Sequence, residues 1–246
     1  MQFIRVTFFL LVLFAGAACF AQDVLYTDFD KFDYRSDEYA IAGMSGGKLY
    51  LYTCVSGSPQ LNAYDDSMNK TATVLLDFFP AKIYHARFIA YPDKIIALYQ
   101  ALEGGRVVQY AALLDETGRL KNKPLELGST KTGIFGATRS YFEQAISENR
   151  KSILIYSAED KSDGVELECK WLDDNLTLIK KCRAVFKTDN RAEHGEVNIA
   201  NDGTVFMAAY TTIGAHNYAD RFWLLQLRQG ANKFEPRELY LDDKFA

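Results

Sequence analysis

Hydrophobic and polar residues alternate along this chain in four successive units that share one order of strands and turns. Each unit reads as a strand, a short polar turn, a more hydrophobic strand, a variable loop, a third strand, a second turn and a fourth strand. The second strands begin at Lys48, Lys94, Lys151 and Thr204, so the units repeat after 46, 57 and 53 residues. Strand-built repeats of this length are typical of β-propeller blades.

The repeat predicts an all-β, propeller-like domain over residues 22–246, with four four-stranded blades at about 37–78, 84–127, 140–187 and 193–241. Two arrangements satisfy this pattern: a closed small propeller, and an open arc of a longer propeller. In the closed form, the strand-like segment Val24–Phe32 would lie beside the last blade and remove an exposed edge. An open arc would leave an apolar sheet face exposed at its end.

Residues 1–21 have the pattern of a secretory signal peptide. Arg5 precedes the apolar run Val6–Ala15, which is too short to span a bilayer, and the small residues Cys19 and Ala21 precede the expected cleavage point. A lipoprotein with lipid on Cys19 is the alternative. No later segment is long and apolar enough to cross a membrane. We therefore expect an exported protein that is periplasmic, on the outer surface or secreted.

Composition and charge narrow the functional class. Apolar residues make up 48% and aromatic residues 14% of the chain, which suits packed sheets rather than disorder. The net charge is −4 and no Lys/Arg cluster occurs, so we expect no nucleic-acid partner. No Walker, Gly-x-Ser-x-Gly, His-Glu-x-x-His or Cys-x-x-Cys pattern is present. The sequence thus predicts no cofactor, no metal and no catalytic residue.

Three segments of the chain resemble the strands and turns of secreted bacterial β-propeller-like repeat proteins. They are Asn201–Met207, Tyr110–Gly118 and Arg237–Asp243. The resemblance extends over most of residues 37–243 and implies a propeller-like fold and export. It implies no activity, since many of those proteins have none assigned, and it brings no catalytic residue to this chain.

Polar residues on the first strands of two units are the best candidates for a binding site. His194, Glu196 and Asn198 are two residues apart, so an unbroken strand would place them on one face. The first strand of a blade lies nearest the central channel, and His85 and Arg87 form the analogous polar face in the second unit. We expect His85, Arg87, His194 and Glu196 to meet near one end of the axis. The alternative is a wet axis lined by polar residues without a ligand.

A second candidate is the loop Thr211–Asp220, which contains His216 and Tyr218. Loops on a rigid scaffold commonly carry binding function, although a solvated insertion is the alternative. The segment Asp160–Gly164 is similar to a calcium loop, but its Gly comes fifth and no matching Glu follows, so we expect no metal there.

The hairpin turn Asp173–Thr177 lies midway between Cys169 and Cys182. In a symmetric hairpin the numbers of opposed residues have a constant sum, which places the two cysteines opposite each other and in reach of a disulfide. Two buried free thiols are the alternative. Cys54 is expected to be a small buried side chain. Asp65, Asp115 and Asp173 each begin a turn and are expected to accept backbone hydrogen bonds there.

These features favour an exported, non-enzymatic binding or scaffold protein whose partner is a protein or glycan at the cell envelope. The alternative is a hydrolase or lyase that acts on polysaccharide or peptide at the central channel. That alternative requires the histidines, arginine and glutamate of the two first strands to share one pocket. A purely structural segment of a larger surface assembly is the third hypothesis.

Overall fold

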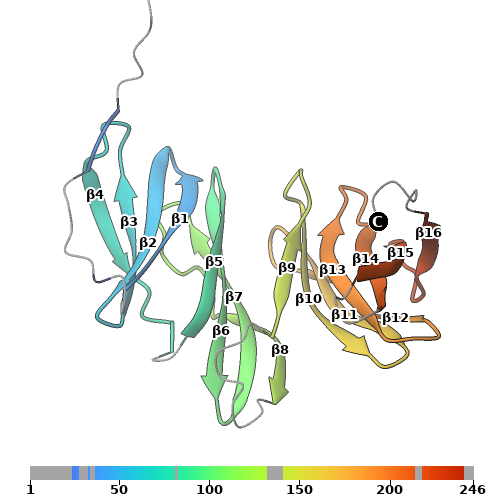
Figure 1. Ribbon diagram of the computed structural model, residues 1–246. Helices are drawn as coiled ribbons and strands as arrows, with labels where there is room; N and C mark the ends of the chain where they lie inside the picture. Colours follow the sequence, from blue (N-terminus) through green and yellow to red (C-terminus); the bar gives the residue numbers. More distant parts are fainter. Residues whose placement is uncertain are drawn as a thin grey trace, which may run out of the picture.

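The computed structural model describes residues 24–27, 33, 37–80, 83–131, 141–213 and 218–240. Regular structure within these residues consists of sixteen β-strands in four antiparallel sheets (Figure 1). Each sheet contains four strands that are consecutive in the sequence and adjacent in space. The predicted all-β, propeller-like fold with four four-stranded blades is confirmed.

The strands of the four blades have the following bounds. Blades 1 and 2 contain β1 (Glu38–Ser45), β2 (Lys48–Val55), β3 (Ser58–Tyr64), β4 (Lys70–Leu75), β5 (Ile83–Tyr91), β6 (Lys94–Glu103), β7 (Arg106–Asp115) and β8 (Leu125–Lys131). Blades 3 and 4 contain β9 (Glu143–Ile146), β10 (Ser152–Lys161), β11 (Gly164–Asp173), β12 (Leu178–Lys187), β13 (Ala192–Ile199), β14 (Val205–Ile213), β15 (Tyr218–Leu227) and β16 (Glu235–Leu239).

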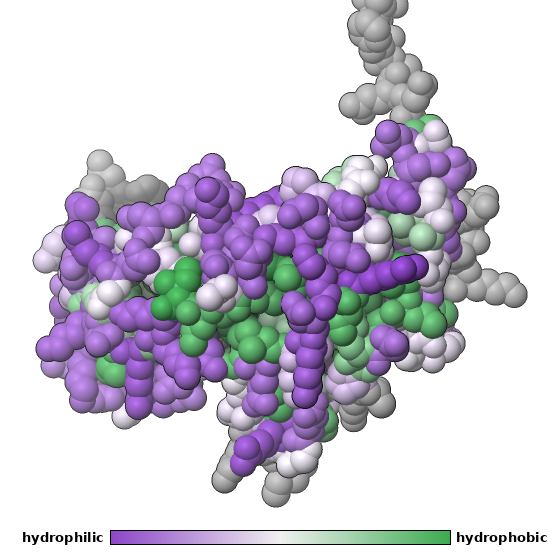
Figure 2. Space-filling view, turned by 180° about the vertical axis from the view of Figure 1, so that it is seen from behind, coloured by the Kyte–Doolittle hydropathy of each residue, from purple (hydrophilic) through white to green (hydrophobic). Residues whose placement is uncertain are grey.

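The four blades follow one another along an open arc, with β4 at one end and β16 at the other (Figure 1). Of the two predicted arrangements, the described residues therefore adopt the open one. Apolar side chains are exposed on the outer faces of both end blades: Ile41 and Leu75 on blade 1, and Leu224 and Leu239 on blade 4. Seen from behind, apolar side chains also form a band across the middle of the molecule, between polar margins (Figure 2).

Three apolar seams hold neighbouring blades together. The seam between blades 1 and 2 is aromatic, with ring centroids 5.0 Å apart for Tyr52 and Phe88 and 4.4 Å apart for Phe79 and Tyr99. The seam between blades 2 and 3 is mainly aliphatic, and its members include Ile96, Leu98, Ile153, Ile155 and Leu172. The seam between blades 3 and 4 includes Leu154, Trp171, Met207, Trp223 and Leu225. Each fully buried large apolar side chain contributes about 1.5–3 kcal/mol, so the seams are the main support of the arc.

The strand β6 shows why a second strand reads as a continuous hydrophobic run. Ile95, Ala97 and Tyr99 face blade 1, whereas Ile96 and Leu98 face blade 3, and all five are buried. Both faces of this strand are covered, so neither set of alternating positions is polar.

One five-residue turn recurs between the third and fourth strands of blades 1, 2 and 3. It begins at Asp65, Asp115 or Asp173, whose carboxylate accepts the N–H groups of the second and fourth residues after it at 2.8–3.0 Å. The third residue after the Asp has a left-handed backbone; these residues are Met68, Gly118 and Leu176. Residues 200–204 of blade 4 repeat the backbone pattern, with Gly203 at the left-handed position (φ 80°).

The turns between the first and second strands are connected along one rim of the arc. Three hydrogen bonds link them in blade order: Gly46 N–H to the Pro92 carbonyl (2.8 Å), the Tyr91 hydroxyl to the Arg150 carbonyl (2.6 Å), and Asn149 N–H to the side-chain carbonyl of Asn201 (2.9 Å). This chain of contacts fixes the first strands of the blades relative to one another.

The first strand of blade 4 contains a β-bulge that changes which residues share a face. His194 lies opposite Ala209, but Val197 lies opposite Met207, so β13 has one extra residue between these pairs. Asn198, the next residue, therefore lies on the other face from His194. The prediction that His194 and Asn198 share a face is wrong, because it assumes an unbroken strand.

Residues 24–27 are not in a strand, so the predicted strand Val24–Phe32 is wrong for that part. Residues 28–32 and the predicted signal peptide, 1–21, lie outside the described residues. Where the structure describes the chain, it contains no helix that is both long and apolar enough to cross a bilayer.

Candidate binding site at the first strands

A groove of about 530 Å³ lies where the first strands of three blades meet, and we call it the axial groove. Gly43 and Met44 of β1 line one side, Arg87 of β5 lines the middle, and Glu148 and Arg150 of the turn after β9 line the other side. Because these residues come from three blades, the groove exists only when the blades are packed together.

Arg150 is held in place by its own turn and by blade 2. Its backbone is left-handed (φ 57°), and its N–H donates to the Ser147 carbonyl at 2.8 Å. The carbonyl of Arg150 accepts from the Tyr91 hydroxyl, and its guanidinium Nη1 donates to the Ala90 carbonyl at 3.1 Å. The remaining guanidinium N–H groups are therefore presented from a fixed position.

Arg87 reaches the axial groove because of a second β-bulge. In β5 the pair Tyr84–Gln100 is followed by the pair Arg87–Leu98, which leaves one extra residue between them. Bulges redirect nearby side chains, and here Arg87 lies on the face toward blade 3. His85 lies within the bulge with a φ of 49°, is exposed and does not line the groove.

Tyr156 on β10 is buried, and its hydroxyl is influenced by two acidic side chains and by Arg87 of the axial groove. Burial raises the pKa of the Tyr156 hydroxyl, and the carboxylates of Glu143 and Glu196 raise it further. A hydrogen bond from the backbone of Val197 and the positive charge of Arg87 lower it. The charges of Arg87 on blade 2 and Glu196 on blade 4 therefore both act on this hydroxyl.

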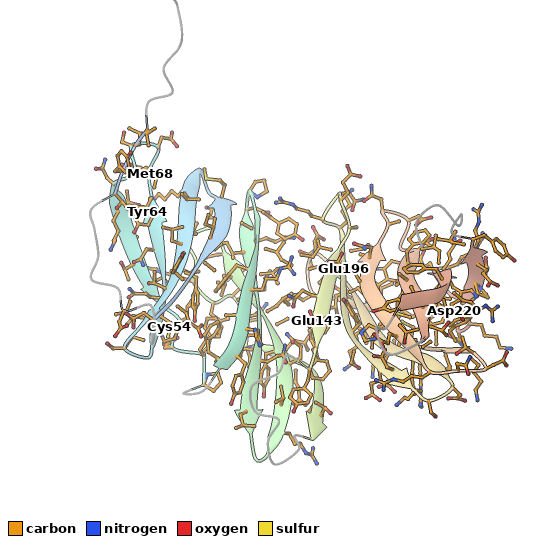
Figure 3. All side chains as sticks on the ribbon, in the orientation of Figure 1. Cys54, Tyr64, Met68, Glu143, Glu196 and Asp220 are labelled. Atoms are coloured by element: carbon orange, nitrogen blue, oxygen red, sulfur yellow. A yellow bond between two sulfur atoms is a disulfide. The ribbon has the colours of Figure 1, made fainter. Side chains whose placement is uncertain are left out.

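Glu143 and Glu196 lie in the middle of the arc, on the first strands of blades 3 and 4 (Figure 3). Glu143 is directly opposite Tyr156 in the β9–β10 pair. The sequence analysis did not single out either residue of that pair. The symmetry of the hairpin about the turn at residues 148–150 would have placed them opposite each other.

His194 is not part of the axial groove. Its Nδ1 lies 2.6 Å from the carboxylate of Asp160 on β10, and its backbone N–H donates to the same oxygen at 3.0 Å. Asp160 belongs to the segment that is similar to a calcium loop, and its neighbour Asp163 pairs with Lys187 at 2.9 Å. In the described part of the chain, no group of three or more potential metal-ligating side chains is assembled.

The predicted loop 211–220 is wrong at both ends, because residues 211–213 belong to β14 and residues 218–220 to β15, and residues 214–217 lie outside the described residues. His216 lies outside them, and Tyr218 begins β15 but its side chain lies outside the described part.

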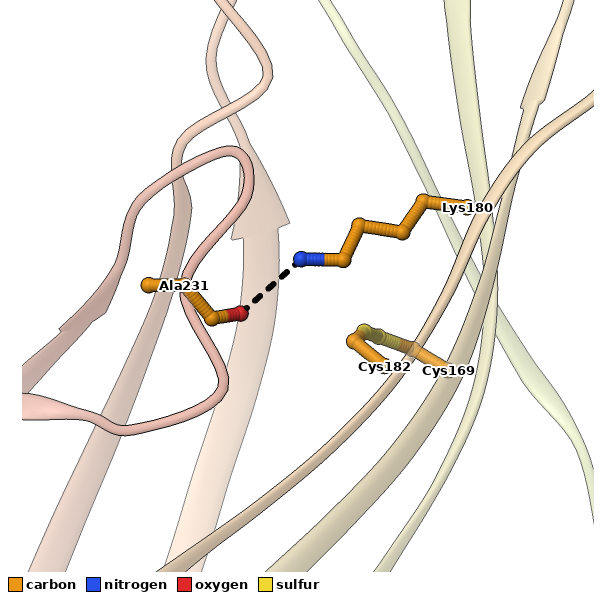
Figure 4. The surroundings of a disulfide bond; sticks show 4 residues. All are labelled: Cys169, Lys180, Cys182 and Ala231. Atoms are coloured by element: carbon orange, nitrogen blue, oxygen red, sulfur yellow. Dashed lines mark hydrogen bonds between the residues drawn. A yellow bond between two sulfur atoms is a disulfide. The ribbon is translucent and has the colours of Figure 1, made fainter.

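Cys169 and Cys182 form a disulfide across β11 and β12, with Cα atoms 5.1 Å apart (Figure 4). The two residues are directly opposite each other in the sheet. Lys180, close to the bond in Figure 4, donates from Nζ to the Ala231 carbonyl of blade 4 at 3.1 Å. Cys54 is a half-buried free thiol whose pKa is raised, chiefly by burial.

The sheets and their seams define the chain as a propeller-like β-protein of four blades. No protein-family model matches the chain, and no curated protein sequence matches it. Among solved structures, it is similar to a chain described as the crystal structure of the D477G ACO/RPE65 chimera, monoclinic crystal form, with 11% identity and a TM-score of 0.38. The match covers 77% of this chain and 45% of that chain, so this chain spans less than half of its length. A likeness of this degree supports no functional argument.

Proposed function

We propose that this protein is an exported, propeller-like binding protein that holds a carboxylate-bearing protein or glycan of the cell envelope in the axial groove. The observation that carries the proposal is that Arg87 and Arg150 line one groove of about 530 Å³. Neither guanidinium forms an ion pair with a residue that the structure describes. A guanidinium presents a rigid fork of N–H donors that matches the two oxygens of a carboxylate.

The rigid placement of Arg150 supports binding over a merely solvated surface. Arg150 is held by hydrogen bonds to its own turn and to blade 2, and the backbone of Arg87 lies between the β5 bulge and the buried residues Phe88 and Ile89. Pre-organised groups lose little conformational freedom when a ligand arrives, which leaves more of the interaction free energy for affinity.

Export is supported by the cysteines as well as by the pattern of the first 21 residues. Disulfides persist in oxidising compartments and are rare in the cytosol. The Cys169–Cys182 bond joins two adjacent strands within blade 3, where it stabilises the sheet rather than serving an exposed redox function.

The alternative, a hydrolase or lyase at the central channel, is less well supported. It requires His85, Arg87, His194 and Glu196 to share one pocket. The imidazole of His194 is bonded instead to Asp160 on blade 3, and His85 does not line the axial groove. We therefore propose binding rather than catalysis at this site.

Two labelled probes test the proposal: a tetragalacturonate for a glycan partner, and a pentaglutamate peptide for a protein partner. Their uncharged counterparts, the tetra-methyl ester and pentaglutamine, are the matched probes. Fluorescence anisotropy at low salt should show binding of at least one acidic probe and of neither neutral probe, since the attraction is between charges.

The variants Arg87→Gln and Arg150→Gln should each weaken that binding by about 10- to 100-fold, because a hydrogen bond to a charged group contributes about 1.5–3 kcal/mol. Arg237→Gln is the control, since Arg237 is exposed on β16 at the far end of the arc. Unchanged affinity in both groove variants would rule out this site.

A further inference from the structure

A second cavity, of about 220 Å³, lies between β8 of blade 2 and the sheet of blade 3. Leu127, Phe142 and Ile155 give it an apolar lining, and Lys170 and Lys181 also line it. Pockets for drug-sized ligands measure about 300–1,000 Å³, so this cavity suits a smaller molecule. It shares no lining residue with the axial groove.

The two lysines violate a local rule of sheet stability. Lys170 and Lys181 are directly opposite each other on β11 and β12, and like charges in that position destabilise a sheet. The pKa of Lys170 is lowered by its burial and by the charge of Lys181, while Glu126 opposes the shift. Positions that break a local rule without a structural benefit are commonly functional.

No carboxylate of the described chain neutralises the pair with an ion pair. Glu168 lines the same cavity, but its carboxylate lies 3.5 Å from Nε of Arg183. Lys170 donates from Nζ to the Leu127 carbonyl, which is a neutral acceptor. Within the described residues, neither ammonium group therefore forms an ion pair, and Glu126 acts on Lys170 only through its charge.

The surroundings keep the pair in position. The Cys169–Cys182 disulfide is one residue away on each strand and holds β11 and β12 together against the repulsion. On the other side of the cavity, the side-chain amide of Gln100 donates to the Phe142 carbonyl at 2.9 Å and accepts from Tyr141 N–H at 3.0 Å. Both walls are thus fixed by bonds that do not involve a ligand.

We propose that this cavity binds a small amphipathic carboxylate. Its apolar part would pack among Leu127, Phe142 and Ile155, and its carboxylate would lie between the ammonium groups of Lys170 and Lys181. Such a ligand would form the ion pairs that Lys170 and Lys181 do not form within the described residues, and it would cover apolar side chains at the same time.

Phenylacetate and hexanoate are suitable probes, with phenylacetamide and acetate as controls for the charge and the apolar part. Isothermal titration calorimetry of the whole chain should show saturable binding of at least one probe, and at least tenfold weaker binding of both controls. Equal binding of phenylacetate and phenylacetamide would overturn the proposal, as would the absence of binding by both probes.

Lys170→Met and Lys181→Gln should each weaken the binding by tenfold or more, while the ligand-free protein unfolds at the same or a higher urea concentration than the parent. If the lysines were purely structural, the variants would bind the probe as the parent does and would unfold at a lower urea concentration. Lys181 is exposed, so its variant keeps the test decisive if Lys170→Met does not fold. Lys180→Met is the control outside the cavity, and Arg87→Gln should leave phenylacetate binding unchanged, which separates this site from the axial groove.

Discussion

Replacement of Gly203 by alanine should destabilise the seam between blades 3 and 4 far more than the same change at Gly118. Both glycines occupy the left-handed position of the same five-residue turn, with φ values of 80° and 81°. A Cβ atom at Gly203 would lie 1.6 Å from the ring of Trp171, whereas at Gly118 its nearest neighbour, a ring carbon of Tyr50, is 3.4 Å away. Met68 and Leu176 occupy this position in other blades, so the turn itself accepts a side chain.

The size of the difference follows from the two separate costs. A left-handed backbone costs alanine about 1–2 kcal/mol at either position. Overpacking against the buried Trp171 adds about 1–3 kcal/mol at Gly203 alone. We therefore expect a loss of about 1–2 kcal/mol for Gly118→Ala and about 2–5 kcal/mol for Gly203→Ala.

Urea unfolding monitored by tryptophan fluorescence is the appropriate assay. The chain has two tryptophans, Trp171 and Trp223, and both are buried in the seam between blades 3 and 4. Blades in a repeat protein can unfold separately, and this signal reports the seam in question. Equal midpoint shifts for the two variants would refute the close packing of Gly203 against blade 3.

Two further predictions concern a turn and the disulfide. Asp65→Ala should lower the melting temperature at pH 7 more than Asp66→Ala, because only Asp65 accepts hydrogen bonds from the turn. The hydrogen bond from the Asn69 backbone N–H is the main cause of the lowered pKa of Asp65. This stabilisation is therefore complete above the usual pKa of about 3.9 and is lost as the pH falls through the lowered value; a difference that does not decrease between pH 5 and pH 2 would contradict this. Replacement of both Cys169 and Cys182 by alanine should cost about 3 kcal/mol in urea unfolding, since the bond closes a loop of 13 residues, and a loss below about 0.5 kcal/mol would argue against it.

Much of the fold could be predicted from the sequence because alternation specifies which residues share a face. Turn residues fix the hairpins, and the symmetry that places Cys169 opposite Cys182 also places Lys170 opposite Lys181. The choice between a closed ring and an open arc could not be predicted from alternation or from turn residues. It depends on the angles between blades, which are set by the shapes of side chains in the seams and not by alternation.

The candidate site was harder to predict because it depends on bulges and on contacts between blades. One extra residue in β13 changes the face of every residue after it, and no residue type marks such a position unambiguously. The bond between His194 and Asp160 joins residues 34 positions apart on different blades. Neither hydrophobic alternation nor turn chemistry carries information about that pairing.

Affinity of the double variant Arg87→Gln/Arg150→Gln for the acidic probes is the most direct test of carboxylate binding in the axial groove. We predict that anisotropy detects binding by the parent protein and by Arg237→Gln, and a loss of about 100-fold or more in the double variant while its urea midpoint is unchanged. Parent-like affinity in the double variant would show that the ligand, if any, is bound elsewhere.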